Sequence, residues 1–216
     1  MLSKEDFRKA LEEAINSAKK RRFVQSVELL MKLKDIDMRR PENRIRAEVE
    51  LPKGRGKEVK IAFIGDGILA EKAAELLGKE NVYTKEQIEK LAKEKKRNLK
   101  KLAKRYYWFL IKADLLRVLA PLIAPVFGPR NKIPKPVATP EQLESMVERL
   151  RKTVRVDSKR NPVLMLPIGT ETMNLDDLAE NAAAAYSQLV ALLPHKEQNV
   201  EHVYVKLTMG PAVRVK

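Results

Sequence analysis

Strand-like patterns stand near both ends of this chain, and their placement constrains the fold more than any other feature. Ser26–Leu33 and 44–51 alternate apolar and polar residues with a period of two, as half-buried strands do. Near the other end, 163–168 is a short apolar run and 203–207 alternates again. Because an isolated pair of strands is marginal in water, we expect these four strands to form one sheet.

Two helices are expected to cover one face of that sheet. Ser3 is a candidate N-cap, with Glu5 and Asp6 in the first turn, and apolar residues then recur at helical spacing. Asn174 is the candidate cap of a second helix that runs to about Leu193 and has two acidic residues in its first turn.

The middle of the chain has a different pattern, in which apolar strands alternate with helical stretches. Such alternation predicts a parallel sheet. The expected strands are Ile61–Ile64, 81–84 and 107–112, and the expected helices are Gly67–Leu77, 115–126 and 140–150, with Thr84 and Thr139 as helix caps.

The sequence therefore predicts two domains. An α+β domain is formed by both chain ends, 1–58 plus 155–216, and an α/β domain, 59–154, is inserted into it. The two connecting linkers are expected near 52–58 and 152–156, and two linkers in parallel behave as a hinge.

Charge points to a polyanionic partner. The chain has 44 Lys and Arg against 29 Asp and Glu, a formal net charge of +15. Residues 59–154 have 21 basic and 11 acidic residues, whereas 155–216 has seven of each. Without a polyanionic partner, such an excess of positive charge would only add repulsion within the protein. Nucleic acid is therefore the expected class of partner.

Composition excludes several kinds of site. The chain has no cysteine and two histidines, which excludes a thiolate site and a multi-histidine metal site. No apolar run approaches the ~18 residues of a membrane span, and the first residues do not resemble a signal peptide. No arrangement typical of a catalytic centre is found. We expect a soluble cytoplasmic protein with no metal, no cofactor, no catalytic residues and no membrane partner.

One turn permits a nucleotide-binding interpretation. Gly65-x-Gly67-x-x-Ala70 follows an apolar strand, as in the loose dinucleotide fingerprint. Asp66, however, puts a carboxylate where a pyrophosphate would approach the helix. The acidic residue expected after the second strand is replaced by Thr84-Lys85. We favour a tight turn that requires glycine, with a nucleotide-binding enzyme as the alternative.

Two basic segments lie in the middle block. Residues 93–105 hold eight basic residues and one acidic residue and predict a basic amphipathic helix, for phosphate contact or simply for solvation. Residues 128–136, GPRNKIPKP, are expected to project Arg130, Lys132 and Lys135 from a stiff loop. A rigid connection between elements is an equally good interpretation of that loop.

Two further segments combine groups that suit RNA. Thr208-Met209-Gly210 directly follows the last strand and supplies a hydroxyl, a soft apolar side chain and close backbone approach. Arg21, Arg22 and Phe23 precede the first strand. A turn that ends a strand and a helix end followed by a core Phe explain these two segments as well.

These motifs resemble the archaeal form of the uL1 family of large ribosomal subunit proteins. The resemblance rests on GPRNKIPKP, on the terminal TMGPAVRVK and on the stretch FVQSVELLMKLKDIDMRRPENRIRAEVELPKG, and it covers essentially the whole chain in order. It implies a split α+β domain with an inserted three-layer, Rossmann-like α/β domain that binds no nucleotide. It also implies binding to a folded stem of large-subunit rRNA, a mobile stalk that assists exit-site tRNA release, and repression of translation from the protein's own mRNA.

The resemblance also assigns site residues. RNA binding by the first domain falls on Arg22, Phe23, Ser26, Glu28, Lys159, Arg160, Thr208, Met209 and Gly210. A secondary RNA contact or structural loop falls on Gly128, Pro129, Arg130, Lys132 and Lys135.

The implied partners are the ribosome with its rRNA, the exit-site tRNA and the regulatory mRNA element, and the free protein is expected to be a monomer. Only 5% of the residues are aromatic, which favours recognition of folded RNA by shape over single-strand stacking. A general basic coat protein for nucleic acid remains a rival interpretation.

Overall fold

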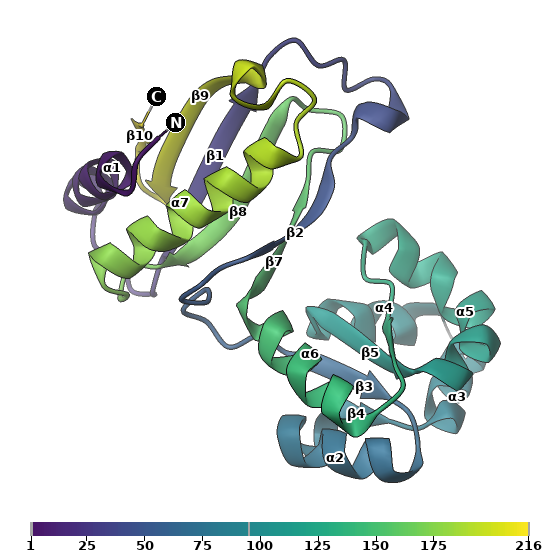
Figure 1. Cartoon of the computed structure of the whole chain (residues 1–216). Helices are drawn as coiled ribbons and strands as arrows, with labels where there is room; N and C mark the ends of the chain where they lie inside the picture. Colours follow the sequence, from purple (N-terminus) through teal and green to yellow (C-terminus); the bar gives the residue numbers. More distant parts are fainter. Residues whose placement is uncertain (1, 95, 216) are drawn as a thin grey trace. The chain divides into compact units, whose positions relative to one another are not determined.

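The computed structural model describes residues 2–94 and 96–215, without the side chain of Lys96, and divides the chain into two units (Figure 1). Unit 1 is Met1–Glu58 with Arg151–Lys216, and unit 2 is Val59–Leu150. The chain returns to unit 1 at 150/151, four residues before the boundary expected from the sequence. The difference arises because most of the expected linker 152–156 belongs to a strand, β7 (Thr153–Asp157), which pairs with β2 (Arg46–Glu50) of unit 1.

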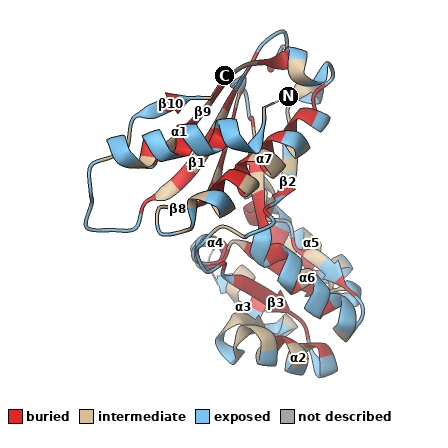
Figure 2. Cartoon of the chain, turned by 60° about the vertical axis from the view of Figure 1, so that its left-hand side comes forward, coloured by how far each residue is buried: buried red, intermediate tan, exposed pale blue. Residues whose placement is uncertain are grey.

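Unit 1 contains a four-stranded antiparallel sheet in the order β10 (Ala212–Arg214), β9 (Val200–Leu207), β1 (Ser26–Leu33) and β8 (Val163–Thr170). Helices α1 (Lys4–Ser17) and α7 (Leu175–Ala191) pack together on one face (Figure 2). The inward residues of β1 are buried and its outward residues are not, as the alternation predicts. The buried residues of β1 are Val27, Leu29, Met31 and Leu33.

The expected partner strand 44–51 is not in this sheet. It forms β2 (Arg46–Glu50), which pairs with β7 in a separate two-stranded sheet. This sheet shares the hydrophobic core of unit 1. The fourth strand of the sheet is β10 instead. The chain turns back after Gly210, and β10 pairs with β9. β10 has three residues, too few for an alternation to be recognised in the sequence.

Unit 2 is a three-layer α/β unit around a parallel sheet in the order β4-β3-β5-β6. Helices α2 and α6 pack on one face of the sheet and α3, α4 and α5 on the other, in two separate cores. The strands are β3 (Ile61–Ile64), β4 (Val82–Tyr83), β5 (Trp108–Lys112) and β6 (Lys135–Val137). The helices are α2 (Gly67–Leu77), α3 (Lys85–Glu94), α4 (Lys96–Arg105), α5 (Ala113–Phe127) and α6 (Pro140–Lys152).

The basic segment 93–105 is helical on both sides of Lys95, which lies outside the described residues. Within the described residues, α3 ends at Glu94 and α4 begins at Lys96. The apolar stripe of α4, formed by Leu99, Leu102 and Ala103, is buried in the core that α4 shares with α3 and α5.

Predicted helix caps are confirmed. The Ser3 hydroxyl accepts from the Asp6 amide while the Asp6 carboxylate accepts from the Ser3 amide, and the Asn174 side chain accepts from the Asp176 amide. Thr84 pairs reciprocally with Gln87, and Thr139 accepts from the Gln142 amide. The remaining 3₁₀ turns are Pro41–Asn43, Lys79–Asn81, Gly128–Arg130 and Lys196–Asn199.

Candidate RNA interface

Ser26 at the start of β1 and Thr208 just beyond β9 are joined by three hydrogen bonds. The Thr208 amide donates to the Ser26 carbonyl at 3.0 Å, the Thr208 hydroxyl donates to the same carbonyl at 3.2 Å, and the Ser26 amide donates to the Thr208 hydroxyl at 3.2 Å. These contacts continue the ladder between β1 and β9 by one residue. They bring together two of the segments that the sequence singled out separately.

The buried Gln25 side chain forms hydrogen bonds that fix the backbone next to Ser26 and Thr208. Its side-chain oxygen accepts from the Met209 amide at 3.1 Å, and its side-chain nitrogen donates to the Lys19 carbonyl and the Glu171 carboxylate. The Glu171 carboxylate also accepts from the Gln25 amide at 2.9 Å. Gln25 is 1% exposed, so these contacts fix the turn around Met209 from within the protein.

The segments that Gln25 fixes present large apolar side chains to solvent. Phe23 is 53% exposed, Val24 46% and Met209 57%. Such residues are normally buried. Their exposure in two segments that the Gln25–Met209 hydrogen bond joins is typical of a binding surface. Phe23 is therefore not a core residue, the interpretation that the sequence left open. Arg22 beside it is also exposed.

The face of the sheet away from the helices continues this surface. Glu28 lies on it, in register with Lys206 of β9 on one side and Pro167 of β8 on the other. The next outward position of β1, Leu30, lies between Tyr204 and Met165. Lys206 and Tyr204 were missed by sequence reasoning, although the alternation of 203–207 places both on the outward face.

Lys57 also reaches this surface, from a segment that the sequence assigned to a linker. Its Nζ atom donates to the Ser26 hydroxyl at 2.9 Å. The loop is shaped by Gly56, whose φ is +67° and whose backbone leaves no room for a Cβ, since that atom would lie 2.6 Å from Met173 Sδ and Thr170 Oγ1. The glycines at 54 and 56 are the sequence feature that could have indicated this loop, because both adopt a positive φ that other residues rarely adopt.

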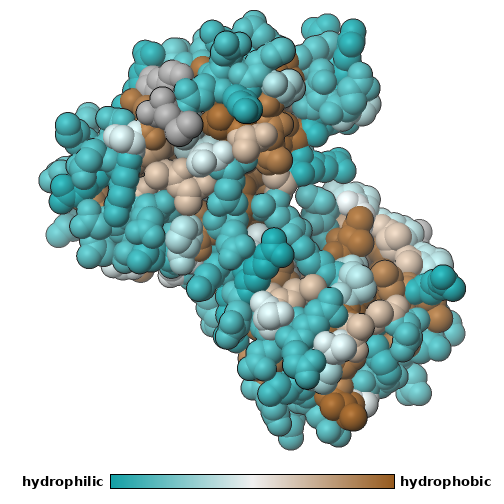
Figure 3. Space-filling model, in the orientation of Figure 1, coloured by the Kyte–Doolittle hydropathy of each residue, from teal (hydrophilic) through white to brown (hydrophobic). Residues whose placement is uncertain are grey.

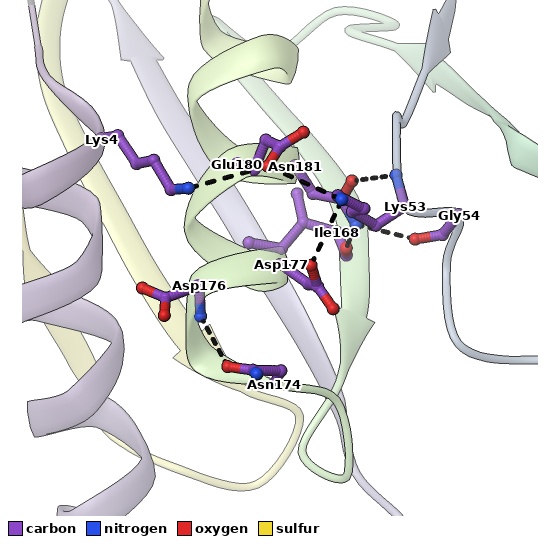
Figure 4. A network of polar contacts seen from close by, with 9 residues as sticks. All are labelled: Lys4, Lys53, Gly54, Ile168, Asn174, Asp176, Asp177, Glu180 and Asn181. Atoms are coloured by element: carbon purple, nitrogen blue, oxygen red, sulfur yellow. Dashed lines mark hydrogen bonds and ion pairs between the residues drawn. The ribbon is translucent and has the colours of Figure 1, made fainter.

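Asn181 of α7 anchors that loop (Figure 4). Its side-chain oxygen accepts from the Lys53 amide at 2.9 Å, and its nitrogen donates to the carbonyls of Gly54 and Ile168 at 2.7 and 2.8 Å. Asn181 is fully buried. One amide side chain therefore ties the loop to both α7 and β8. Its loss would remove the partner of three backbone groups, of which the Ile168 carbonyl belongs to a buried residue.

The ion pairs in the same network contribute less. Lys53 lies 3.6 Å from Asp177 and 3.9 Å from Glu180, and Lys4 lies 3.6 Å from Glu180. Their side chains are 41–46% exposed. Exposed pairs of this kind are worth ~0–1 kcal/mol, so the buried amide and not the charges positions the loop.

Lys159 and Arg160 are not brought to this surface. They lie in the turn between β7 and β8, where Lys159 has a left-handed φ of 49° and donates its amide to Asp157. β8 begins beside Lys32 and ends beside Ser26. At about 3.4 Å per residue, this turn is roughly 24 Å along the strand from the Ser26 end.

The cations of residues 128–136 do not project into solvent as expected. Arg130 donates to the Val126 carbonyl at 2.8 Å, and Lys132 donates to the carbonyls of Ala103 and Tyr106 at 2.7 and 2.5 Å. Lys135 belongs to β6 and lies 5.1 Å from the centre of the Trp108 ring. These groups hold α4, α5 and β5 together, which supports the interpretation of a structural loop.

The turn after β3 has the geometry of a tight connection. A Cβ at Gly65 would lie 2.6 Å from the Phe63 ring, and Gly67 has a φ of +64°. Asp66 pairs with Lys112 at 2.7 Å, and the hydrogen bond to Asp66 raises the pKa of Lys112. The start of α2 thus has a carboxylate of its own where a phosphate would bind.

Other kinds of site find no support in the described residues. No three His, Asp or Glu side chains among them lie close enough together to hold a metal ion. Within the same residues, no helix is long and apolar enough to cross a membrane.

Comparison with known proteins gives a consistent result. The model of the ribosomal protein L1p/L10e family matches residues 11–211. The chain is 49% identical over 207 residues to the large ribosomal subunit protein uL1 of Thermococcus kodakarensis, covering 95% of this chain and 94% of that protein. It is 43% identical over 215 residues to the protein of the same name from Methanocaldococcus jannaschii, covering 100% and 97%.

These relatives are ribosomal proteins and not enzymes, in agreement with the prediction from the sequence. The family match, residues 11–211, includes residues of both units. The chain belongs to the ribosomal protein L1p/L10e family.

Proposed function

We propose that this protein binds a folded stem of large-subunit rRNA as a structural component of the cytoplasmic ribosome. The observation that carries the proposal is the surface around Ser26 and Thr208, where exposed Phe23 and Met209 adjoin a fixed polar edge and Lys57. Hydroxyl, amide and cationic groups on a rigid sheet suit phosphates and 2′-hydroxyl groups of folded RNA.

The finer roles follow from the family resemblance. The bound protein forms the mobile stalk beside the exit site and assists release of deacylated tRNA there. It also represses translation of its own mRNA by binding an element that mimics the rRNA site, since one rigid surface serves two RNAs of the same shape. The free protein is a monomer in this proposal.

A salt-titrated binding assay tests the proposal. It compares a fragment of the rRNA stalk stem with a generic RNA duplex of equal length. We expect a preference of about a thousandfold for the stalk fragment that survives added salt, within the range of specific over non-specific binding. Equal affinities that fall together with salt would instead indicate a general basic coat protein.

A further inference from the structure

The solvent side of α4 is a stripe of cations. Positions 97, 100, 101, 104 and 105 are three or four residues apart and therefore share one side of the helix. The first and fourth of them lie about 10 Å apart along the helix axis, which spans several phosphates of one strand. The α4 stripe, as we name it, comprises Arg97, Lys100, Lys101, Lys104 and Arg105, all of them exposed.

The stripe has no counter-charge. α4 contains no acidic residue. The ion pairs of unit 2 among the described residues involve other cations, Lys72, Lys85 and Lys112. Glu94, the nearest acidic residue in the sequence, accepts a hydrogen bond from Asn98. Like charges at this spacing destabilise a helix. Lys104 and Arg105 are favourable in the last helical turn, but the fold of unit 2 gains little from Arg97, Lys100 and Lys101.

A hollow lies beside the stripe. Its volume is about 310 Å³, and its lining combines apolar side chains with Tyr83, Asn98 and two of the cations. The Arg105 guanidinium is held 5.3 Å from the centre of the Tyr106 ring. The lining residues are Tyr83, Leu91, Asn98, Lys101, Leu102 and Arg105.

The exposed groups of this surface suit a polyanion and not a bilayer. A helix that binds an anionic membrane inserts its apolar side, but Leu99, Leu102 and Ala103 of α4 are buried in unit 2. Hydrophilic side chains cover most of the molecular face seen in Figure 3, with hydrophobic ones in small patches. A hollow lined by apolar, polar and cationic side chains suits the ribose and base edge of a strand whose phosphates lie on the cations.

We propose that the α4 stripe is a second RNA-binding surface, which holds the phosphate backbone of the bound RNA without reading its sequence. The inference rests on the proposed function, that this chain binds large-subunit rRNA, and it assigns the inserted unit an electrostatic share of that binding. Unit 1 then supplies the discrimination between RNAs, and the α4 stripe supplies affinity that salt weakens.

The test is a triple variant of the full chain, Lys100→Gln with Lys101→Gln and Lys104→Gln. Each phosphate contact contributes about 0.7–0.9 to the slope of log affinity against log salt, so the slope for the stalk fragment is expected to shrink by roughly 2 to 3. Between 50 and 200 mM salt, the parent chain then loses about 20- to 40-fold more affinity than the variant.

A matched control removes the same charge elsewhere, by Lys9→Gln with Lys60→Gln and Lys72→Gln, at residues outside α4. We expect the control to keep the parental slope. A slope that shrinks equally in both variants would mean that net charge and not the stripe is responsible. A triple variant with parental slope and affinity, and with a parental unfolding transition, would overturn the proposal.

This assay distinguishes failure of the proposed rRNA-binding function from failure of the proposed role of the α4 stripe. If the parent chain does not discriminate the stalk fragment but the triple variant still loses slope, the α4 stripe binds RNA and the specific function is wrong. An acidic protein as the true partner would leave RNA binding by the triple variant unchanged, which contradicts the inference.

Discussion

The Thr208 hydroxyl both donates to the Ser26 carbonyl and accepts from the Ser26 amide, across 182 residues of sequence. This places the end of β9 beside the start of β1 and leaves one lone pair of the hydroxyl open to solvent. The same contact therefore builds the candidate RNA interface and takes part in it. Four substitutions and one ligand titration test the roles of these residues.

Thr208→Val keeps the shape of the side chain and removes the hydroxyl. We expect binding to the stalk fragment to weaken by ~1–3 kcal/mol, about 5- to 150-fold, because a polar contact is lost and the Ser26 groups lose a partner. The salt slope should not change, since no charge is removed. Thr208→Ser is the control and should bind as the parent chain does. Parental affinity of the valine variant would remove Thr208 from the interface.

Arg22→Ala removes an exposed cation beside Phe23. We expect the slope of log affinity against log salt to shrink by about 0.7–0.9, the value for one phosphate contact. Arg22→Lys should keep the slope, because it keeps the charge. A smaller affinity with an unchanged slope would show that Arg22 acts through packing or hydrogen bonding instead.

Asn181→Leu replaces a buried amide by an apolar side chain of similar size. We expect unit 1 to lose roughly 2–4 kcal/mol of stability, because the Lys53 amide and the carbonyls of Gly54 and Ile168 lose their partner. Urea unfolding measures the loss, and hydrogen exchange at the Lys53 amide locates it. The neighbouring Glu180→Gln, which removes only exposed ion pairs, should cost less than about 1 kcal/mol.

Lys132→Met separates the two interpretations of residues 128–136. We expect unit 2 to lose ~1–3 kcal/mol of stability, since the Ala103 and Tyr106 carbonyls lose a charged donor. The salt slope of RNA binding should stay at the parental value. Lys79→Met, at an exposed position of the same unit, is the stability control. A reduced slope in the Lys132 variant would restore the interpretation of this loop as an RNA contact.

Titration with a dinucleotide tests the alternative function. We expect no saturable binding in the micromolar range, because the Asp66 carboxylate stands at the start of α2 and is paired with Lys112. Asp66→Asn is the informative comparison. If that variant gained affinity and the parent chain had none, the turn would have the shape of a nucleotide site but the wrong charge.

Much of the fold could be predicted from the sequence because its signals are local. The alternation of Ser26–Leu33, the caps at Ser3 and Asn174 and the fully apolar strand Ile61–Ile64 each depend on residues a few positions apart. Insertion of the α/β unit between two halves of an α+β unit followed from where those signals stand. The tight turn at Gly65 and Gly67 was predictable for the same reason, since its backbone requirement lies in the turn itself.

Tertiary structure decided which segments meet. β2 pairs with β7 and leaves its expected place to the three-residue β10, because register and partner depend on the whole core and not on either strand alone. Gln25 meets Met209, Asn181 meets the loop of Lys53, and Lys57 meets Ser26 through hydrogen bonds between residues 31 to 184 positions apart. The sequence by itself determined the elements and the excess of positive charge. Only the folded chain decided which cations are used inside the protein, as Lys132 is, and which remain free for a partner, because an ammonium group binds whichever acceptor the packing places within reach.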